Sequence, residues 1–203
     1  MKIIGLTGFR GVGKSEFAEH LKKIHGFTSV HAFAGGKCAS EAYFRHIVGP
    51  DFQPEMAHEM VHGCLRDTPL PYFPKLRDNE GNPTDQHATP RYFMEMFGNF
   101  MATTLGPEWT LGTEINLLER SGFNGNLIVE SVVYEDQIIR EKGGMVVRID
   151  RPGAGSRGLK TCAVVEKITP DVIFLNDGDS LEEAFRRFDA QLGLDRDLSP
   201  DIA

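Results

Sequence analysis

The sequence predicts a three-layer α/β fold built around a mostly parallel sheet. Short apolar runs at 126–131 and 171–175 have the length of buried strands, and stretches with helical spacing separate such runs. Strands that alternate with helices form a parallel sheet with helices on both faces. A chain of 203 residues can form one such domain with room for an insertion.

The first helix and second strand follow directly from the N-terminal pattern. Residues 15–24 have helical spacing that places Phe17, Leu21 and Ile24 on one face, so we expect these three side chains to be buried together. Residues 28–34 predict the second strand.

The middle of the chain has a mixed character. Helical patterns at 37–48 and 54–65 lead into residues 67–90, where Pro, Gly and Asn are dense enough that we expect no regular element. Thr89 and Pro90 then predict the start of a helix, with Thr89 as N-cap and Pro90 in the first turn.

The last third returns to regular alternation. It predicts strands at 126–131, 145–149 and 171–175 and helices at 134–142 and 180–192. Gly143 and Gly144 are expected to end the first of these helices. Ser180 and Glu183 predict a capping box at the start of the second.

Composition excludes several classes of protein. A net charge of -7 argues against a nucleic-acid binder, which normally has a basic surface. No stretch is long and apolar enough to span a bilayer, and no signal peptide opens the sequence, so we expect a cytoplasmic protein without a membrane partner. Cys38, Cys64 and Cys162 are expected to be reduced thiols in buried or half-buried positions.

The segment from Gly8 to Ser15 matches the pattern G-x-x-x-x-G-K-[ST] in full, at the junction of a predicted strand and helix. Glycines let backbone N–H groups converge on a phosphate, and the helix N-terminus adds partial positive charge. The predicted ATP-binding residues of this loop are Gly8, Arg10, Gly11, Val12, Gly13, Lys14 and Ser15. Lys14 would reach the β- and γ-phosphates, and the Ser15 hydroxyl would hold Mg²⁺.

A bound nucleotide and its metal also call for an acidic group. Glu130 ends the strand at 126–131, and the carboxyl ends of neighbouring parallel strands share one crevice. We therefore expect Glu130 and Ser15 to form the Mg²⁺ site.

Residues 58–62, HEMVH, match the zinc-peptidase pattern H-E-x-x-H, in which two histidines bind zinc and Glu59 acts as base. The residues that follow supply no obvious third ligand. The pattern is kept as a remote alternative to a polar helix face.

Beyond the phosphate loop, the chain resembles the deoxynucleoside monophosphate kinases of phages, within the wider group of nucleoside monophosphate and dephospho-coenzyme-A kinases. The segments that carry the resemblance are HAFAGGK at 31–37, TPRYFMEMFG at 89–98, GPEW at 106–109, the strand–helix–strand unit at 126–153 and DVIFLNDGDSLEEAF at 171–185. Their order and spacing, more than any one of them, support the likeness.

The resemblance implies a P-loop NTPase fold with about five strands, and transfer of the γ-phosphate of ATP to a (deoxy)nucleoside monophosphate. The core would comprise 1–36 and 126–193, the acceptor-binding insertion about 37–125 and the lid about 151–169. The family resemblance implies that the chain has no nucleic-acid partner. It also implies that the chain works in the host cytoplasm if a phage encodes it. A homodimer is left open.

The resemblance also assigns roles to residues outside the loop. Lys37, Arg91, Glu95 and Glu130 would bind the acceptor, and Arg151 and Arg157 of the lid would join Lys14 as catalytic residues. Asn176 and Gly178 would lie near the adenine.

The chain departs from the family in two places. An Asp-x-Arg often follows the third strand, but residues 130–133 here are Glu-Ser-Val-Val; a Gly-Thr-Glu often follows the central helix, but residues 98–100 are Gly-Asn-Phe. Both differences concern the acceptor. A kinase of another small metabolite, such as a dephospho-coenzyme-A-like acceptor, and a regulatory nucleotide-binding protein with weak ATPase activity therefore remain alternatives.

Overall fold

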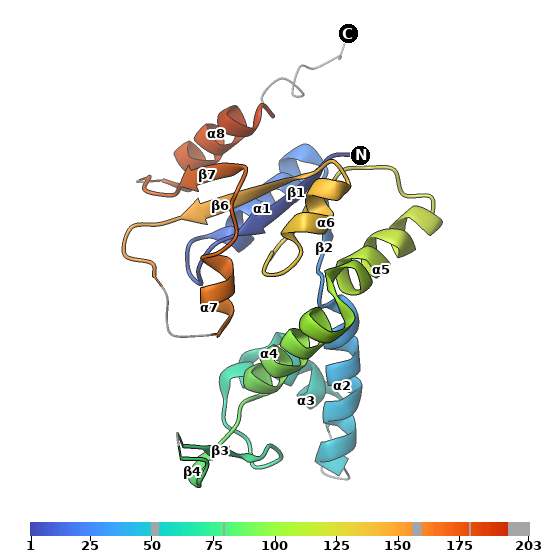
Figure 1. The fold of residues 1–203 in the computed structure, drawn as a ribbon, viewed down its shortest axis with the longest axis vertical. Coiled ribbons are helices and arrows are strands. Elements are labelled where there is room, and N and C mark those ends of the chain that lie inside the picture. Colours follow the sequence, from blue (N-terminus) through green and yellow to red (C-terminus); the bar gives the residue numbers. More distant parts are fainter. Residues whose placement is uncertain (50–52, 79, 156–159, 179, 195–203) are drawn as a thin grey trace. The chain divides into compact units, whose positions relative to one another are not determined.

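The structure is a computed structural model. It describes residues 1–49, 53–78, 80–155, 160–178 and 180–194. Two compact units make up the chain: unit 1 comprises Met1–Ala32 and Leu111–Ala203, and unit 2 comprises Phe33–Thr110 (Figure 1).

Within its described residues, unit 1 contains a five-stranded parallel sheet with the strand order β2-β5-β1-β6-β7 (Figure 1). The strands are β1 (Ile3–Thr7), β2 (Thr28–Val30), β5 (Leu127–Val129), β6 (Met145–Asp150) and β7 (Val172–Leu175). In the centre, Gly5 of β1 pairs with Val129 on one side and Val146 on the other. The predicted α/β fold is confirmed, and its central strand leads directly into the phosphate loop.

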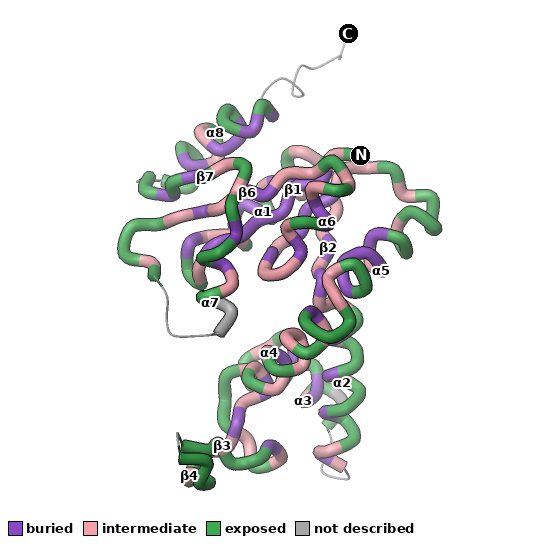
Figure 2. Tube along the Cα trace, in the orientation of Figure 1, coloured by how far each residue is buried: buried purple, intermediate pink, exposed green. Residues whose placement is uncertain are grey.

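One face of the sheet is covered by α1 (Lys14–His25) and α8 (Leu181–Leu192). Three aromatic rings join these helices to β7: the Phe17 ring lies 4.7 Å from that of Phe188 and 5.1 Å from that of Phe174, centroid to centroid. The Phe17–Phe174 pair packs edge to face, which adds to the free energy gained from burying the rings. Figure 2 shows the corresponding buried stripe on α8.

The opposite face is covered by α5 (Pro107–Arg120) and α6 (Asp136–Glu141), with Leu111, Ile115 and Ile139 fully buried. α5 starts in unit 2 and continues into unit 1. These helices complete the third layer of the predicted fold.

The ends of two helices agree with their predicted caps, with one correction. Gly144 donates its N–H to the carbonyl of Ile139, which closes α6 as expected. The Ser180 hydroxyl accepts the N–H of Glu183 at the start of α8. The Glu183 carboxylate, however, binds Arg186 at 2.7 Å, so only half of the predicted capping box forms.

The predicted buried face of α1 is wrong at one position. Phe17 and Leu21 are fully buried, but Ile24 is 52% exposed. The buried stripe advances from Leu21 by four residues to His25, whose side chain is only 4% exposed. Spacings of three and four residues both fit a helical face, and the contact with α8 selects between them.

The predicted second strand is also too long. β2 ends at Val30, whose partner Val129 is the last residue of β5, and α2 (Ala34–Val48) begins soon afterwards. Lys37 therefore lies in the first turn of a helix and not at the end of a strand.

Unit 2 is mainly helical. Besides α2 it contains α3 (Pro54–His62), α4 (Pro90–Phe100) and the short helices η2 (Cys64–Asp67) and η3 (Met101–Leu105). Its core is an apolar cluster with Phe44 at the centre, whose ring lies 5.1 Å from that of Phe73 and 5.3 Å from that of Phe93. Thr89 caps α4 as predicted, since its hydroxyl accepts the N–H of Tyr92.

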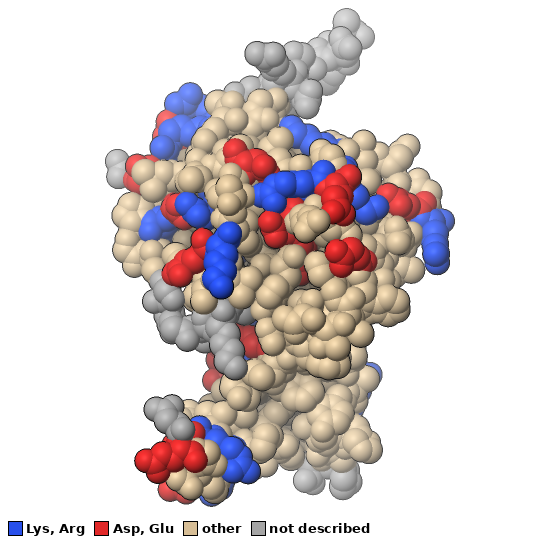
Figure 3. All heavy atoms as spheres, viewed as in Figure 1, with Lys and Arg blue, Asp and Glu red and all other residues tan. Residues whose placement is uncertain are grey.

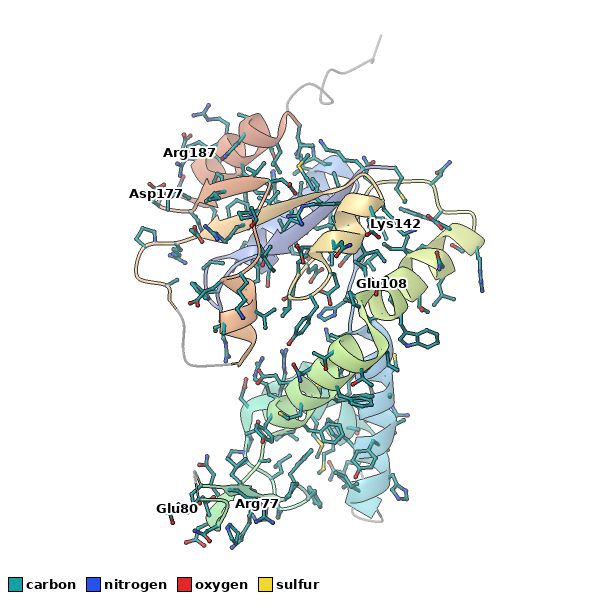
Figure 4. The ribbon with its side chains drawn as sticks, in the orientation of Figure 1. Arg77, Glu80, Glu108, Lys142, Asp177 and Arg187 are labelled. Carbon is teal, nitrogen blue, oxygen red and sulfur yellow. The ribbon has the colours of Figure 1, made fainter. Side chains whose placement is uncertain are left out.

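The expectation of no regular element in residues 67–90 is wrong. β3 (Lys75–Arg77) and β4 (Pro83–His87) form an antiparallel hairpin with an irregular register. Arg77, labelled with Glu80 in Figure 4, donates to the carbonyl of Gly81 across the turn at 2.6 Å. Gly81 and Asn82, two of the residues that suggested a loop, therefore belong to the turn between two short strands.

Two further expectations can be compared with the structure. Among the described helices, none is long and apolar enough to cross a membrane. The cysteines are free thiols, but Cys38 and Cys64 are exposed, contrary to expectation, and only Cys162 on α7 (Lys160–Val165) is buried.

Candidate phosphate-binding site

The loop between β1 and α1 has the backbone of an anion-binding nest. Gly8, Gly11 and Gly13 have φ angles of 133°, 85° and 102°. These values lie in a region that residues with a Cβ rarely adopt, so the three glycines allow the tight curve of the loop. Gly13 is the N-cap of α1 and provides no side-chain cap for the helix, which begins with Lys14. The first turn can therefore offer its N–H groups to a phosphate.

The Lys14 side chain folds back over this loop. Its ammonium group donates to the carbonyl oxygens of Gly8 and Phe9, each at 2.8 Å. Burial lowers the pKa of Lys14 below its usual value, and the nearby Cys162 partly offsets this effect. The described partners of the Lys14 ammonium are two backbone carbonyls, which it can exchange for phosphate oxygens at little structural cost.

Asn176, which follows β7, holds the loop from the other side. Its side-chain amide donates to the buried carbonyl of Val12 at 2.8 Å. The next residue, Asp177, accepts from Arg187 of α8 at 2.9 Å; both side chains are labelled in Figure 4. The turn that contains Asn176 and the exposed Gly178 is thus fixed both to α8 and to the phosphate loop.

Glu130 lies one residue beyond β5. Its Oε1 atom accepts the Ser29 hydroxyl at 2.5 Å and lies 4.0 Å from the ammonium of Lys22. Ser15 is exposed at the start of α1. The described contacts of Glu130 thus involve β2 and α1, and the proposed partnership with Ser15 would need a metal ion or water between them.

Two cavities adjoin the loop within unit 1. One, of about 350 Å³, has Phe9, Val12, Arg148 and Arg151 among its lining residues. The other, of about 430 Å³, is lined by Arg10, Gly11 and residues 151–155. Arg151 borders both, so the structure brings this predicted lid residue together with the loop. Arg157 lies outside the described residues.

Sequence reasoning did not single out Arg148. Its Nε atom is buried, has no hydrogen-bond partner among the described residues and lies 3.3 Å from the Asp150 carboxylate. The available signal was a charged pair at the end of an otherwise apolar strand, Met145–Asp150. Arg148 thus places a guanidinium in the wall of the cavity beside the loop, next to the Asp150 carboxylate that lines the same cavity.

Glu135 was also missed. It is only 5% exposed, and one of its carboxylate oxygens accepts the N–H groups of Val133 and Tyr134 at 2.9 Å. Burial raises the pKa of Glu135 above its usual value, although the two N–H donors act in the opposite direction. Glu135 closes the turn after β5, close in sequence to Glu130.

The predicted acceptor residues other than Glu130 lie in unit 2. The Arg91 guanidinium binds the Asp67 carboxylate through both Nε and Nη2, which raises the pKa of Arg91, and Glu95 adds to this effect. Burial lowers the pKa of His62, and the charges of His58 and of Lys37, in the first turn of α2, add to this effect. The fork of Arg91 thus already holds an anionic group in a bidentate arrangement.

The H-E-x-x-H pattern lies on α3, where the rings of His58 and His62 are 4.8 Å apart. Glu41 of α2 comes near both histidines, which is the third group that the sequence did not reveal. Glu41 also pairs with Arg45, and the Glu59 carboxylate accepts the N–H of Cys64 at 2.8 Å. The carboxylate that a peptidase would use as base is therefore engaged in closing its own helix.

The face of unit 1 in Figure 3 carries Lys and Arg side by side with Asp and Glu.

No protein-family model matches the chain, and no curated protein matches it. Solved structures similar to it include a sugar kinase from Janibacter sp. HTCC2649, at 14% identity and a TM-score of 0.41 over 98% of this chain and 99% of that one. Another is the dephospho-CoA kinase from Campylobacter jejuni, at 14% identity and a TM-score of 0.44 over 95% of this chain and 99% of that one. A third is the shikimate kinase from Bacteroides thetaiotaomicron, at 12% identity and a TM-score of 0.43 over 95% of this chain and 99% of that one. All three are kinases, but at these TM-scores the likeness carries no argument about this chain, whose fold rests on its own sheet order and loop.

Proposed function

We propose that the chain is a P-loop phosphotransferase that binds ATP at residues 8–15 and transfers its γ-phosphate to a small acceptor. The observation that carries this proposal is the loop itself: three glycines with positive φ at the start of α1, with the Lys14 ammonium held at 2.8 Å from the Gly8 and Phe9 carbonyls. Such a nest binds phosphate oxygens through backbone N–H groups.

Catalysis of phosphoryl transfer needs positioning and charge stabilisation more than covalent chemistry. Lys14 would neutralise charge on the transferring group, and Arg151 and Arg157 of the lid would add to this. Arg151 borders both cavities beside the loop, which supports its place in the proposal. Asn176 and Gly178 are proposed to border the adenine.

The residues present fit a Mg²⁺ ion, which would neutralise charge on the β- and γ-phosphates. Mg²⁺ takes oxygen ligands and keeps several of its waters. Ser15 offers an exposed hydroxyl at the start of α1, and both described contacts of Glu130 use Oε1, which leaves Oε2 for a metal-bound water. We propose Ser15 and Glu130 as the residues that hold it.

We further propose a (deoxy)nucleoside monophosphate as the acceptor, bound by residues of unit 2. Arg91 supports this, because the fork that now binds Asp67 has the geometry to bind a phosphate in the same way. Lys37 and Glu95 are proposed as its companions. A dephospho-coenzyme-A-like acceptor, whose phosphate could bind the same fork, is the second candidate.

The test is a coupled assay of ADP formation with ATP, Mg²⁺ and individual (d)NMPs or dephospho-coenzyme A. One acceptor should stimulate ADP release well above the rate with ATP alone, and Lys14→Ala should abolish that stimulation. Lys23→Ala is the matched control, since Lys23 lies on the same helix with 74% of its side chain exposed. Folded protein that binds ATP but responds to no acceptor would refute the kinase and favour a regulatory nucleotide-binding protein.

A further inference from the structure

Two histidines and an aspartate meet between α1 and α8, in the C-terminal half of α1. His20 and His25 lie on α1, and Asp189 lies on α8. Their side chains are 10%, 4% and 8% exposed. One ligand atom from each lies within 4.8 Å of the others. The proposed function of the loop uses none of these residues.

The hydrogen bonds leave this cluster incomplete. His20 Nε2 lies 2.8 Å from Asp189 Oδ2, a normal hydrogen bond. His25 Nε2 lies 3.0 Å from Asp189 Oδ1, yet neither atom makes a hydrogen bond to any described residue. The two atoms are close enough for an ion pair, but hydrogen-bonding capacity on both remains unused although both are buried, which is uncommon for buried polar atoms.

We propose that His20, His25 and Asp189 form a binding site for Zn²⁺ or a similar transition-metal ion. Ligand atoms of a tetrahedral zinc ion, each about 2.0–2.1 Å from the metal, stand about 3.3 Å apart. The separation of 3.0 Å between His25 Nε2 and Asp189 Oδ1 is close to that spacing, and neither atom is engaged in another described hydrogen bond.

The ligand types select the metal. Imidazole nitrogens favour Zn²⁺ and its neighbours in the transition series, whereas Mg²⁺ prefers oxygen ligands. The carboxylate is the one charged ligand of this set, and a bound divalent cation would neutralise its negative charge. The Mg²⁺ that would accompany ATP is therefore not expected to compete here.

The surroundings hold the rings in place and give access. The His20 ring stacks on Phe185 of α8, with centroids 4.3 Å apart and planes at 8°. A cavity of about 550 Å³ is lined by His20 and Phe185, so it reaches the cluster at the His20 ring. Lys23 also lines this cavity, but Glu19 lies 3.9 Å from its ammonium and offsets its charge.

A metal ion at this position would fasten α1 to α8. α1 begins with Lys14 of the phosphate loop, and α8 follows the turn whose Asn176 binds the loop at Val12. The ion would therefore brace, from the opposite end, the two helices whose N-terminal ends lie at the nucleotide site. We expect its effect to be on stability.

The test uses the full chain, stripped with a chelator and titrated calorimetrically with Zn²⁺ alone, and with Co²⁺ alone as a spectroscopic probe. The wild type should bind one ion at this site, show the visible absorption of tetrahedral Co²⁺ and melt at a higher temperature with Zn²⁺. His20→Gln and Asp189→Asn should each lose that ion and the thermal shift. His20→Gln is the primary variant, because the His20 side chain is the most exposed of the three ligands and its replacement should disturb the core least.

The matched control is His58→Gln combined with His62→Gln, which removes the other candidate cluster of unit 2. This control should retain the bound ion and the shift in melting temperature. Absence of binding by the wild type would overturn the proposal, as would binding that survives His20→Gln and disappears in the control. Both readouts are independent of ATP and acceptor, so a failure here would leave the kinase proposal standing.

Discussion

The side-chain amide of Asn176 donates to the carbonyl oxygen of Val12 at 2.8 Å, in the buried interior of unit 1. This bond joins two segments that are 164 residues apart and fixes the phosphate loop against the turn before α8. The loop therefore depends on the last strand of the sheet as well as on its own glycines.

Asn176→Ala should destabilise unit 1 and weaken ATP binding. The substitution leaves the Val12 carbonyl without its partner, which costs about 1–3 kcal/mol for a buried group. Thermal or urea unfolding and ATP titration would measure both effects. Asn116→Ala, at an exposed position on α5, serves as control and should change neither. Equal behaviour of the two variants would contradict the role of Asn176.

Alanine should be tolerated less well at Gly13 than at Gly11. Both glycines have positive φ, so each substitution costs about 1–2 kcal/mol in backbone strain. A Cβ at Gly13 would also lie 2.8 Å from the Asn176 amide nitrogen, whereas one at Gly11 meets nothing within 4 Å.

A double-mutant cycle can measure the coupling between Gly13 and Asn176. If the contact with Asn176 adds to the cost at Gly13, the double variant Gly13→Ala with Asn176→Ala should lose less unfolding free energy than the sum of the two single variants. Strict additivity would show that backbone strain alone explains the effect.

Glu135 should make stability fall as the pH rises from acid towards neutral. Burial raises its pKa above the ordinary value of 4.5, so between that value and the raised one the folded chain keeps a proton that the unfolded chain has lost. The stabilising contribution is complete below 4.5 and is lost as the pH rises through the folded-state pKa.

Glu135→Gln removes this titration while it keeps an oxygen for the Val133 and Tyr134 N–H groups. When the free energy of unfolding is measured from about pH 4 to pH 7, the variant should become more stable relative to the wild type as the pH increases. Glu182→Gln, at an exposed position in the first turn of α8, is the control, and its difference in unfolding free energy from the wild type should stay constant over this pH range. A constant difference between Glu135→Gln and the wild type would rule out the shift.

Arg91→Lys should raise the KM for the acceptor by about tenfold or more, because a lysine cannot reproduce a bidentate fork. The KM for ATP should not change. Asp67→Asn should lower the acceptor KM, since Asp67 occupies the fork that the acceptor phosphate would need. Arg77→Lys, on the exposed hairpin, is the control. An acceptor KM that is the same in Arg91→Lys and the wild type would remove Arg91 from the acceptor site.

Local signals were sufficient wherever one short segment decides the outcome. The positive-φ glycines of the phosphate loop, the Thr89 cap and the Gly143–Gly144 helix end each depend on residues a few positions apart, and the sequence predicted all three. The parallel sheet was also predictable, because alternating strands and helices permit few other arrangements.

Tertiary structure alone decided which distant side chains meet. Asn176 with Val12, Arg91 with Asp67, and Asp189 with two histidines of α1 are pairings between separate elements, and no local periodicity encodes them. Within α1, His25 is buried and Ile24 is exposed. Spacings of three and four residues from Leu21 both fit a buried helical face, and only the packing of α8 selects the second. The sequence by itself determined the phosphate loop and its sheet; packing determined what surrounds them.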